Sequence, residues 1–171
     1  MNDGSLATAR LLVFRVGTLA CAAEVDQVRE ILPRLPTTRI PGAPPVVAGL
    51  VNVRGTLVTV VEGWRALGQQ PPEPPAPAAP STSVAGPATG STIILEVAGR
   101  DVDNGGETRK LIGFTVDEVI DLLAGGDATL EGREGLPGVD PTLVRAVGRG
   151  PRGDVFIVLD VAALLGPILT T

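Results

Sequence analysis

Two segments of this sequence occur twice and in the same order, and this duplication constrains the fold more than any other feature. RGTLVTVVEGWRALG begins at Arg54 and RGDVFIVLDVAALLG begins at Arg152, an offset of 98 residues (152 − 54 = 98). VDQVREIL begins at Val25 and VDEVIDLL begins at Val116, an offset of 91 residues (116 − 25 = 91). Matched segments at similar offsets predict a duplicated structural unit. Chance similarity between short Val- and Leu-rich segments is the alternative.

A Pro- and Ala-rich segment separates the two copies. Residues 69–90, QQPPEPPAPAAPSTSVAGPATG, carry a single charge, and such a composition neither fills a core nor sustains a ladder of backbone hydrogen bonds. We expect a linker here that is extended where it is rich in proline and otherwise disordered. This linker divides the chain into a first half, residues 10–68, and a second half, residues 91–168.

Short strands joined by tight turns are predicted in both halves. LVTVV and VFIVL are continuous apolar runs, as expected for strands that pack on both faces. The Arg-Gly pairs before them fit turns in which glycine supplies a positive φ, and short strands punctuated by glycine are typical of small β-barrels. A helical turn is expected after Glu62 and after Asp160, ending at Gly68 and Gly166.

Apolar residues in VDQVREIL recur at helical spacing. Val25, Val28 and either Ile31 or Leu32 form one stripe, and charged residues lie off it. This pattern predicts a short helix or turn with one apolar face. The element is expected to end at Pro33, because proline disfavours helical geometry in the residue before it.

Asn52 and Arg54 interrupt the otherwise apolar run GLVNVRGTLVTV, residues 49–60. A charge in such a run must reach water or find a partner. Glu30 is a plausible partner for Arg54, since the second half has an acid, Asp121, and an arginine, Arg152, at the matching positions. The alternative is that Arg54 lies on a hairpin tip in water.

Composition and charge exclude several classes of protein. The net charge of −5, with 14 scattered Lys and Arg residues, argues against nucleic-acid binding. The chain has no His and a single Cys, Cys21, which lies in the apolar stretch LACAA and is expected to be an inert buried thiol. Without these residue types the common nucleophile–base pairs and zinc sites cannot form, so we predict no catalysis, cofactor or metal. A binding module remains.

Two short motifs and the N-terminus complete this picture. DVDNGGE, residues 101–107, resembles a calcium-binding loop, but Gly105 stands where an oxygen ligand is needed, so a polar hairpin tip is expected. RGD at residues 152–154 matches RGT in the first half and indicates a turn. The N-terminus lacks the basic start of a signal peptide, and no apolar run reaches the roughly 18 residues of a membrane span. We expect a cytoplasmic protein.

A longer series of segments resembles the CheW-like family of bacterial chemotaxis adaptors. The series is LLVFRVG, EVDQVREIL, PGAPPVVAGLVNVRGTLVTVVEGWRALG, TIILEV, LIGFTVDEVIDLL and GDVFIVLDVAALL, and its G-x-x-N-x-R-G segment, Gly49 to Gly55, is the most specific part. The resemblance implies a single CheW-like domain over residues 10–168. It implies a mainly β fold of two small five-stranded SH3-like β-barrels packed side by side, with short helices.

The resemblance also implies a function. The family consists of non-enzymatic adaptors that couple the cytoplasmic tips of chemoreceptors, the methyl-accepting chemotaxis proteins, to the regulatory domain of a CheA-type histidine kinase, without membrane insertion. Carried over by position, it implies six partner-binding residues: a paired acid and arginine (Glu30, Arg54), exposed apolar contacts to the kinase (Val28, Ile31) and a turn-bearing segment (Gly49, Asn52).

The sequence departs from the family pattern after the apolar strand LVTVV of the first half. The family usually has Val-Ile-Asp-Leu-Arg there, whereas this chain has VVEGWR, so Glu62 and Gly63 replace a capping Asp and a packing Leu. One alternative is therefore a CheW-like scaffold of another two-component or motility pathway without a membrane receptor. A second is a small-ligand-binding β-barrel, which ranks lower because few polar residues fall inside the predicted strands.

Overall fold

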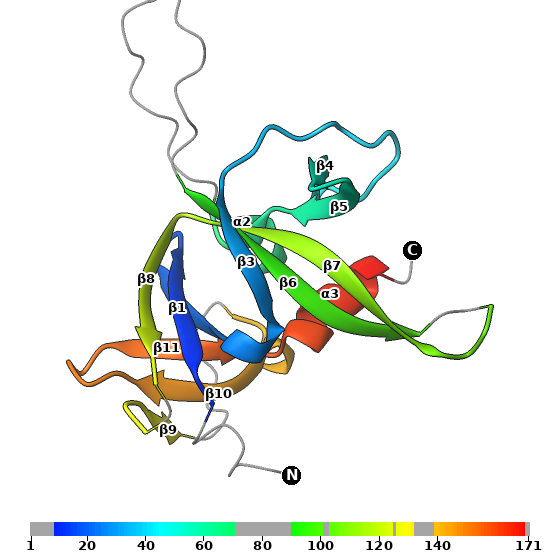
Figure 1. Cartoon of the computed structure of the whole chain (residues 1–171). Coiled ribbons are helices and arrows are strands. Elements are labelled where there is room, and N and C mark those ends of the chain that lie inside the picture. The colour runs from blue at the N-terminus through cyan, green and yellow to red at the C-terminus, as the bar shows by residue number, and fades with distance from the viewer. Residues whose placement is uncertain (1–8, 71–89, 101–102, 125, 132–138, 170–171) are drawn as a thin grey trace, which may run out of the picture.

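The computed structural model describes residues 9–70, 90–100, 103–124, 126–131 and 139–169, and these form a mainly β fold (Figure 1). The first half contains β1 (Leu11–Val16), β2 (Leu19–Glu24), the 3₁₀ turn η1 (Val25–Gln27), β3 (Val28–Pro33), β4 (Val47–Val53), β5 (Thr56–Val61) and α2 (Gly63–Ala66). The second half contains β6 (Ser91–Arg100), β7 (Glu107–Val116), β8 (Glu118–Leu123), β9 (Thr129–Glu131), η2 (Pro141–Leu143), β10 (Val144–Arg149), β11 (Val155–Leu159) and α3 (Val161–Leu169). The predicted mainly β class is confirmed. The segment predicted as a linker lies, apart from its ends, outside the described residues.

The strands form two sheets, and each sheet contains strands from both halves of the chain. The first sheet has six strands in the order β8-β1-β2-β11-β10-β9, and the second has five in the order β3-β6-β7-β5-β4. The expectation that each of the two barrels is built from one half of the chain, the first from residues 10–68 and the second from residues 91–168, is therefore wrong. Strand β3 of the first half pairs with β6 of the second, and β8 of the second half pairs with β1 of the first. The order of strands along the chain therefore does not determine which strands form hydrogen bonds with each other.

This exchange of strands is the same in both directions. In each case the first two strands of one half join the last strands of the other, and the connecting parallel pairs are β2–β11 and β5–β7. Cys21 lies opposite Ile157 in one pair, and Ile112 lies opposite Thr59 in the other. Thr59 and Ile157 are related by the offset of 98 (157 − 59 = 98), so the two registers correspond.

Irregularities in the ladders repeat as well. The register of β4 with β5 shifts between Val47 and Gly49, and that of β10 with β11 shifts between Val144 and Ala146. Similarly, the pairings β3–β6 and β1–β8 each contain one shift directly after the copied VD-x-V segment, at Arg29 in β3 and at the matching Ile120 in β8. Equivalent bulges at equivalent positions confirm the predicted duplication, since chance similarity of short apolar segments would not reproduce them.

The segment VDQVREIL, predicted as a short helix or turn, is mostly a strand, and so is its copy VDEVIDLL. Only Val25–Gln27 forms a 3₁₀ turn, and β3 then alternates between half-buried and exposed residues. Pairing with β6 along its length overrides the helical spacing of the apolar residues. Pro33 is tolerated at the end of β3 because this strand lies at the edge of its sheet.

Two short helices follow the duplicated strands, as predicted. Asp160 caps α3 by accepting a hydrogen bond from the Ala163 backbone N–H at 3.0 Å, whereas Glu62 makes no capping bond to α2. The predicted end at Gly166 is wrong, because α3 continues to Leu169. Among the described helices, none combines the length and the apolar character needed to cross a membrane.

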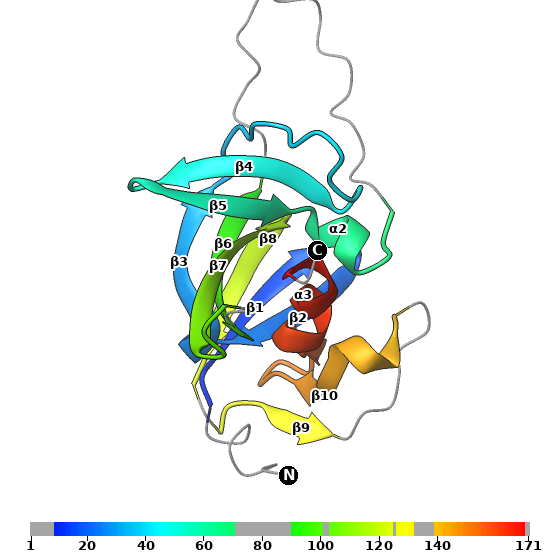
Figure 2. The ribbon, with the colours of Figure 1, turned by 90° about the vertical axis from the view of Figure 1, so that its right-hand side faces the viewer.

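The largest core lies between the two sheets. The residues of β1 contribute to two cores: Leu12, Phe14 and Val16 belong to this shared core, and Leu11 and Val13 belong to a smaller core of the first sheet. Phe14 meets Phe114 of β7 edge to face, with ring centroids 6.0 Å apart. Residues of α2 and α3 join the same core, and Figure 2 shows both helices between the β4–β5 and β9–β10 strand pairs. The two sheets therefore share one interior.

Candidate protein-binding site

The β4–β5 hairpin presents Arg54 at its tip. Its loop consists of Arg54 and Gly55, which have φ of 53° and 86°, and Val53 lies opposite Thr56 across it. Positive φ at both loop positions is the pattern of a type I′ turn, whose twist suits a hairpin. The Gly55 backbone N–H donates to the Asn52 side-chain oxygen at 2.8 Å. Asn52, predicted as a binding residue, thus also holds the turn that presents Arg54.

Glu30 on β3 is the partner of Arg54, as the sequence predicted. The Arg54 Nη2 and Glu30 Oε2 atoms are 3.4 Å apart, and the exposed fractions of the side chains are 82% and 22%. Since the arginine is almost fully in water, the pair contributes only about 0–1 kcal/mol to stability. The arginine nevertheless lies on a hairpin tip in water, so both of the alternatives raised by the sequence hold in part.

The second copy of this arrangement is not paired. Asp121 and Arg152 are both described and exposed, but no ion pair joins them. Asp121 instead accepts a hydrogen bond from the Leu122 backbone N–H at 2.8 Å. The predicted repetition of the pair is wrong: Arg54 lies in a two-residue loop, whereas Arg152 lies in a five-residue loop, residues 150–154, so the two arginines are not presented in the same way.

Gly49 lies within β4 and is buried, so it is not part of a turn. Its φ is 153°, and a Cβ at this position would collide with the Thr38 carbonyl oxygen. Thr38 and Leu50 exchange two backbone hydrogen bonds of 2.8 Å, which join the segment after β3 to β4. The close approach at Gly49 therefore allows the segment after β3 to pair with β4, an edge strand of the second sheet.

Of the two predicted apolar contacts, only Ile31 is exposed. Its exposed fraction is 44%, whereas Val28 packs against the core between the sheets. The structure also exposes Leu57 by 68%, which the sequence did not predict. In the sequence, Leu57 lies in a continuous apolar run, which does not indicate whether it is exposed. In the structure it lies on β5 directly opposite the exposed Asn52, and this position shows which way it faces.

The exposed apolar residues follow the internal duplication. Ile31 corresponds to Leu122 by the offset of 91 (122 − 31 = 91), and Leu57 corresponds to Val155 by the offset of 98 (155 − 57 = 98). All four are among the five large apolar side chains that are exposed in the described part of the chain. We define surface 1 as Glu30, Ile31, Arg54 and Leu57, in which the Glu30–Arg54 ion pair joins β3 to the β4–β5 hairpin. We define surface 2 as the residues at the matching positions of the second half: Asp121, Leu122, Arg152 and Val155. Exposed apolar residues beside charges are typical of protein-binding surfaces.

Cys21 lies away from both surfaces and is fully buried. Burial raises the pKa of its thiol far above the ordinary value, so the group stays protonated and is a poor nucleophile. Across the described residues there is also no group of three or more His, Cys, Asp or Glu side chains placed to hold a metal ion.

Comparison with known proteins assigns the family. The sequence profile of the CheW-like domain matches residues 10–167. This chain belongs to the CheW-like domain family. The CheW-like match runs through both halves of the chain, in keeping with sheets that draw strands from each of them.

Individual CheW-like proteins are similar over most of the chain. A probable chemotaxis protein CheW of Rhizobium etli is 26% identical over 150 residues, which cover 88% of this chain and 79% of that protein. A chemotaxis protein CheW of Rhizobium meliloti is 27% identical over 140 residues, covering 82% and 74% respectively. The scaffolding protein TtCheW of Thermoanaerobacter tengcongensis shares the fold, with a TM-score of 0.69 at 17% identity over 92% of this chain and 88% of that one.

The departure from the CheW-like pattern after β5 has a structural outcome. Glu62 accepts a hydrogen bond from Trp64 Nε1 at 2.7 Å, and Arg34 Nη2 lies 3.4 Å from the same carboxylate oxygen. Gly63 is required because a Cβ there would collide with the Thr115 carbonyl oxygen, and its N–H donates to the Thr115 hydroxyl at 3.0 Å. The sequence VVEGWR thus builds a local network in place of an aspartate cap.

Proposed function

We propose that this chain is a non-enzymatic chemotaxis adaptor that acts in the cytoplasm. It couples the cytoplasmic tips of chemoreceptors to the regulatory domain of a CheA-type histidine kinase by binding both at once. Membership of the CheW-like family supports the chemotaxis role, because relatives of that family bear the name chemotaxis protein CheW. The single observation that carries the coupling role is that exposed apolar residues stand at equivalent positions on the two sheets, Ile31 and Leu57 on the second and Leu122 and Val155 on the first.

Coupling requires that one rigid body offers two separate contact areas. Surface 1 lies on the second sheet and surface 2 on the first, and the two sheets share a common core. Fixed geometry between the surfaces would transmit a change in one partner to the other without any chemistry in the adaptor. An adaptor without chemistry of its own is consistent with a chain whose single thiol is buried and therefore poorly reactive.

Within surface 1 the residues have distinct proposed roles. Ile31 and Leu57 supply apolar area, and fully burying such a side chain contributes about 1.5–3 kcal/mol. Arg54 supplies charge that selects and orients the kinase domain, since charged groups at an interface act mainly on specificity and association rate. Glu30 and Asn52 hold Arg54 in place, and Gly49 and Val28 support the surface from within.

The decisive experiment is calorimetric titration of the full chain against the regulatory domain of the CheA-type kinase from the same organism, and separately against a receptor-tip fragment. We expect binding to both at micromolar or lower Kd, and a ternary complex in which neither displaces the other. Arg54→Glu should weaken binding to the kinase domain by at least about tenfold, and Glu30→Arg/Arg54→Glu should restore part of that affinity.

Lys110→Glu is the matched control for the charge reversal. Lys110 is exposed on β7, outside both surfaces, and has no ion-pair partner among the described residues. The Lys110→Glu variant should bind the kinase domain and the receptor-tip fragment with the same affinities as the wild type. Binding to the kinase without binding to a receptor would favour a scaffold outside chemotaxis. Equal affinities for wild type and Arg54→Glu, with unchanged melting temperatures, would reduce Arg54 to a solvated turn residue.

A further inference from the structure

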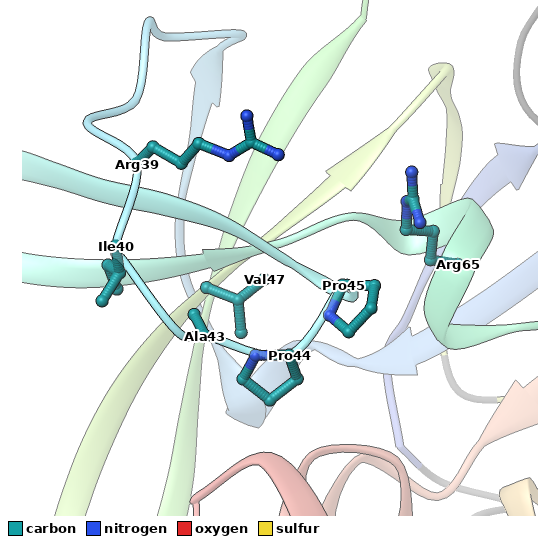
Figure 3. Close-up of a pocket in the computed structure, with 7 residues that line it drawn as sticks. All are labelled: Arg39, Ile40, Ala43, Pro44, Pro45, Val47 and Arg65. Atoms are coloured by element: carbon teal, nitrogen blue, oxygen red, sulfur yellow. The ribbon is translucent and has the colours of Figure 1, made fainter.

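A pocket lies at the opposite end of β4 from the Arg54 hairpin tip. It has a volume of about 230 Å³ and is lined by Arg39, Ile40, Ala43, Pro44, Pro45, Val47 and Arg65 (Figure 3). Val47 begins β4 and Val53 ends it, so at about 3.3 Å per residue the pocket is about 20 Å from the tip. The pocket is therefore distinct from surface 1, and binding in it would not depend on the proposed coupling role.

The apolar wall of the pocket is held by two consecutive turns. Ala43 N–H donates to the Ile40 carbonyl oxygen at 3.3 Å, and Gly42 between them has a φ of 77°, as at the third position of a type II turn. Val47 N–H then donates to the Pro44 carbonyl oxygen at 2.9 Å. Pro44 and Pro45 have no backbone N–H. The wall is thus built in advance, is apolar, and has few hydrogen-bond donors.

Both charged residues of the pocket are arginines with free donors. The Arg65 guanidinium lies 4.5 Å from the Trp64 ring centroid, which orients it by stacking. The nearby Glu62 carboxylate is already bonded to Trp64 and Arg34. Among the residues that the structure describes, neither Arg39 nor Arg65 has a carboxylate partner. Figure 3 shows the two arginines at different ends of the pocket, with the proline wall between them.

We propose that this pocket binds an acidic side chain of a protein partner, with apolar neighbours of that side chain packing on the proline wall. A carboxylate presents two oxygens in one plane, which matches the paired donors of a guanidinium. A phosphate would need further donors, such as backbone N–H groups, and the prolines remove these from the wall. The volume is below the range of about 300–1,000 Å³ that is usual for small-molecule sites, so one side chain fits better than a free ligand.

The test uses NMR titration of the ¹⁵N-labelled full chain with the capped peptide acetyl-Leu-Pro-Glu-Leu-amide. We expect saturable shifts of the Ile40, Ala43, Val47 and Arg65 amide signals, with a Kd of about a millimolar or tighter. The same peptide with Gln in place of Glu should bind at least about tenfold more weakly, because it lacks the charge. Arg39→Gln and Arg65→Gln should each weaken the Glu peptide to a similar degree.

Arg10→Gln is the matched control, because Arg10 is an exposed arginine outside both surfaces and the pocket and has no carboxylate partner in the described chain. It should bind the Glu peptide as the wild type does. Equal shifts with the Glu and Gln peptides, retained binding in the Arg39→Gln/Arg65→Gln double variant, or no saturable shift would overturn the proposal. Tighter binding of inorganic phosphate than of the peptide at equal ionic strength would also overturn it, in favour of a phosphate site.

Discussion

Gly49 and Gly55 lie on the same hairpin, yet the structure requires glycine at each for a different reason. Gly55 has a positive φ at the exposed tip, and a Cβ there would meet nothing within 4 Å. Gly49 combines a φ of 153° with direct contact between its backbone and that of Thr38. Adding a Cβ at Gly55 would cost only the free energy of an unfavourable backbone conformation. Adding one at Gly49 would also displace the neighbouring segment that contains Thr38.

We therefore predict that Gly49→Ala destabilises the protein far more than Gly55→Ala. Gly55→Ala should cost about 1–2 kcal/mol, the usual penalty of a left-handed backbone for a residue with a Cβ. Gly49→Ala should cost about 2–5 kcal/mol, because overpacking adds to the backbone term and the Thr38–Leu50 bridge is lost. Urea unfolding of both variants and the wild type measures the two costs. Equal losses would mean that contact with Thr38 is unimportant.

For the six residues predicted to bind partners, the exposure and pairing expected from the sequence match the structure at some positions and differ at others. The Glu30–Arg54 pair and the exposure of Ile31 follow from the sequence prediction. Val28 packs against the core, Gly49 is buried, and the exposure of Leu57 was not predicted, because burial depends on which neighbours cover each face of the sheet. A continuous apolar run does not reveal that direction.

At the scale of elements, β1 and β7 connect the two sheets through one aromatic contact. Phe14 belongs to the first sheet and Phe114 to the second, and both are almost fully buried. Edge-to-face aromatic pairs contribute about 0.5–1.5 kcal/mol beyond the area they bury. This contact should couple the stability of one sheet to that of the other.

A double-mutant cycle measures this coupling. Phe14→Leu and Phe114→Leu should each destabilise the protein by about 1–3 kcal/mol, and the double variant should lose about 0.5–1.5 kcal/mol less than the sum of the two. Phe156 packs in the separate core of the first sheet, so Phe14→Leu/Phe156→Leu should be additive. Additive losses for Phe14 and Phe114 would show that the sheets do not interact through these rings.

At the scale of the whole molecule, exchange of strands makes the two halves depend on each other. Without the second half, the first sheet would retain only β1 and β2. A two-stranded ribbon is marginally stable at best in water. The second sheet would likewise lose β6 and β7, the strands that connect β3 to β5. Neither half can therefore bury the core that the sheets share.

We predict that fragments 1–80 and 81–171 are each unfolded alone and regain structure when mixed. Circular dichroism should show no cooperative thermal transition for either fragment, and a transition close to that of the intact chain for the equimolar mixture. The intact chain cleaved within residues 71–89 after folding is the control, because the fragments then start from the assembled state. A cooperative transition of one fragment alone would contradict the mutual dependence of the halves.

The sequence by itself determined the mainly β class, the internal duplication, the Arg-Gly turns and the helices after β5 and β11. These features depend on local conformation and on burial patterns, which can be recognised from residues close together in the sequence. Only the tertiary structure decided that β3 pairs with β6 and β8 with β1, that VDQVREIL is mostly a strand, and that Asp121 and Arg152 stay apart. Each of these depends on which distant backbone or side chain comes within reach, and no local pattern contains that information.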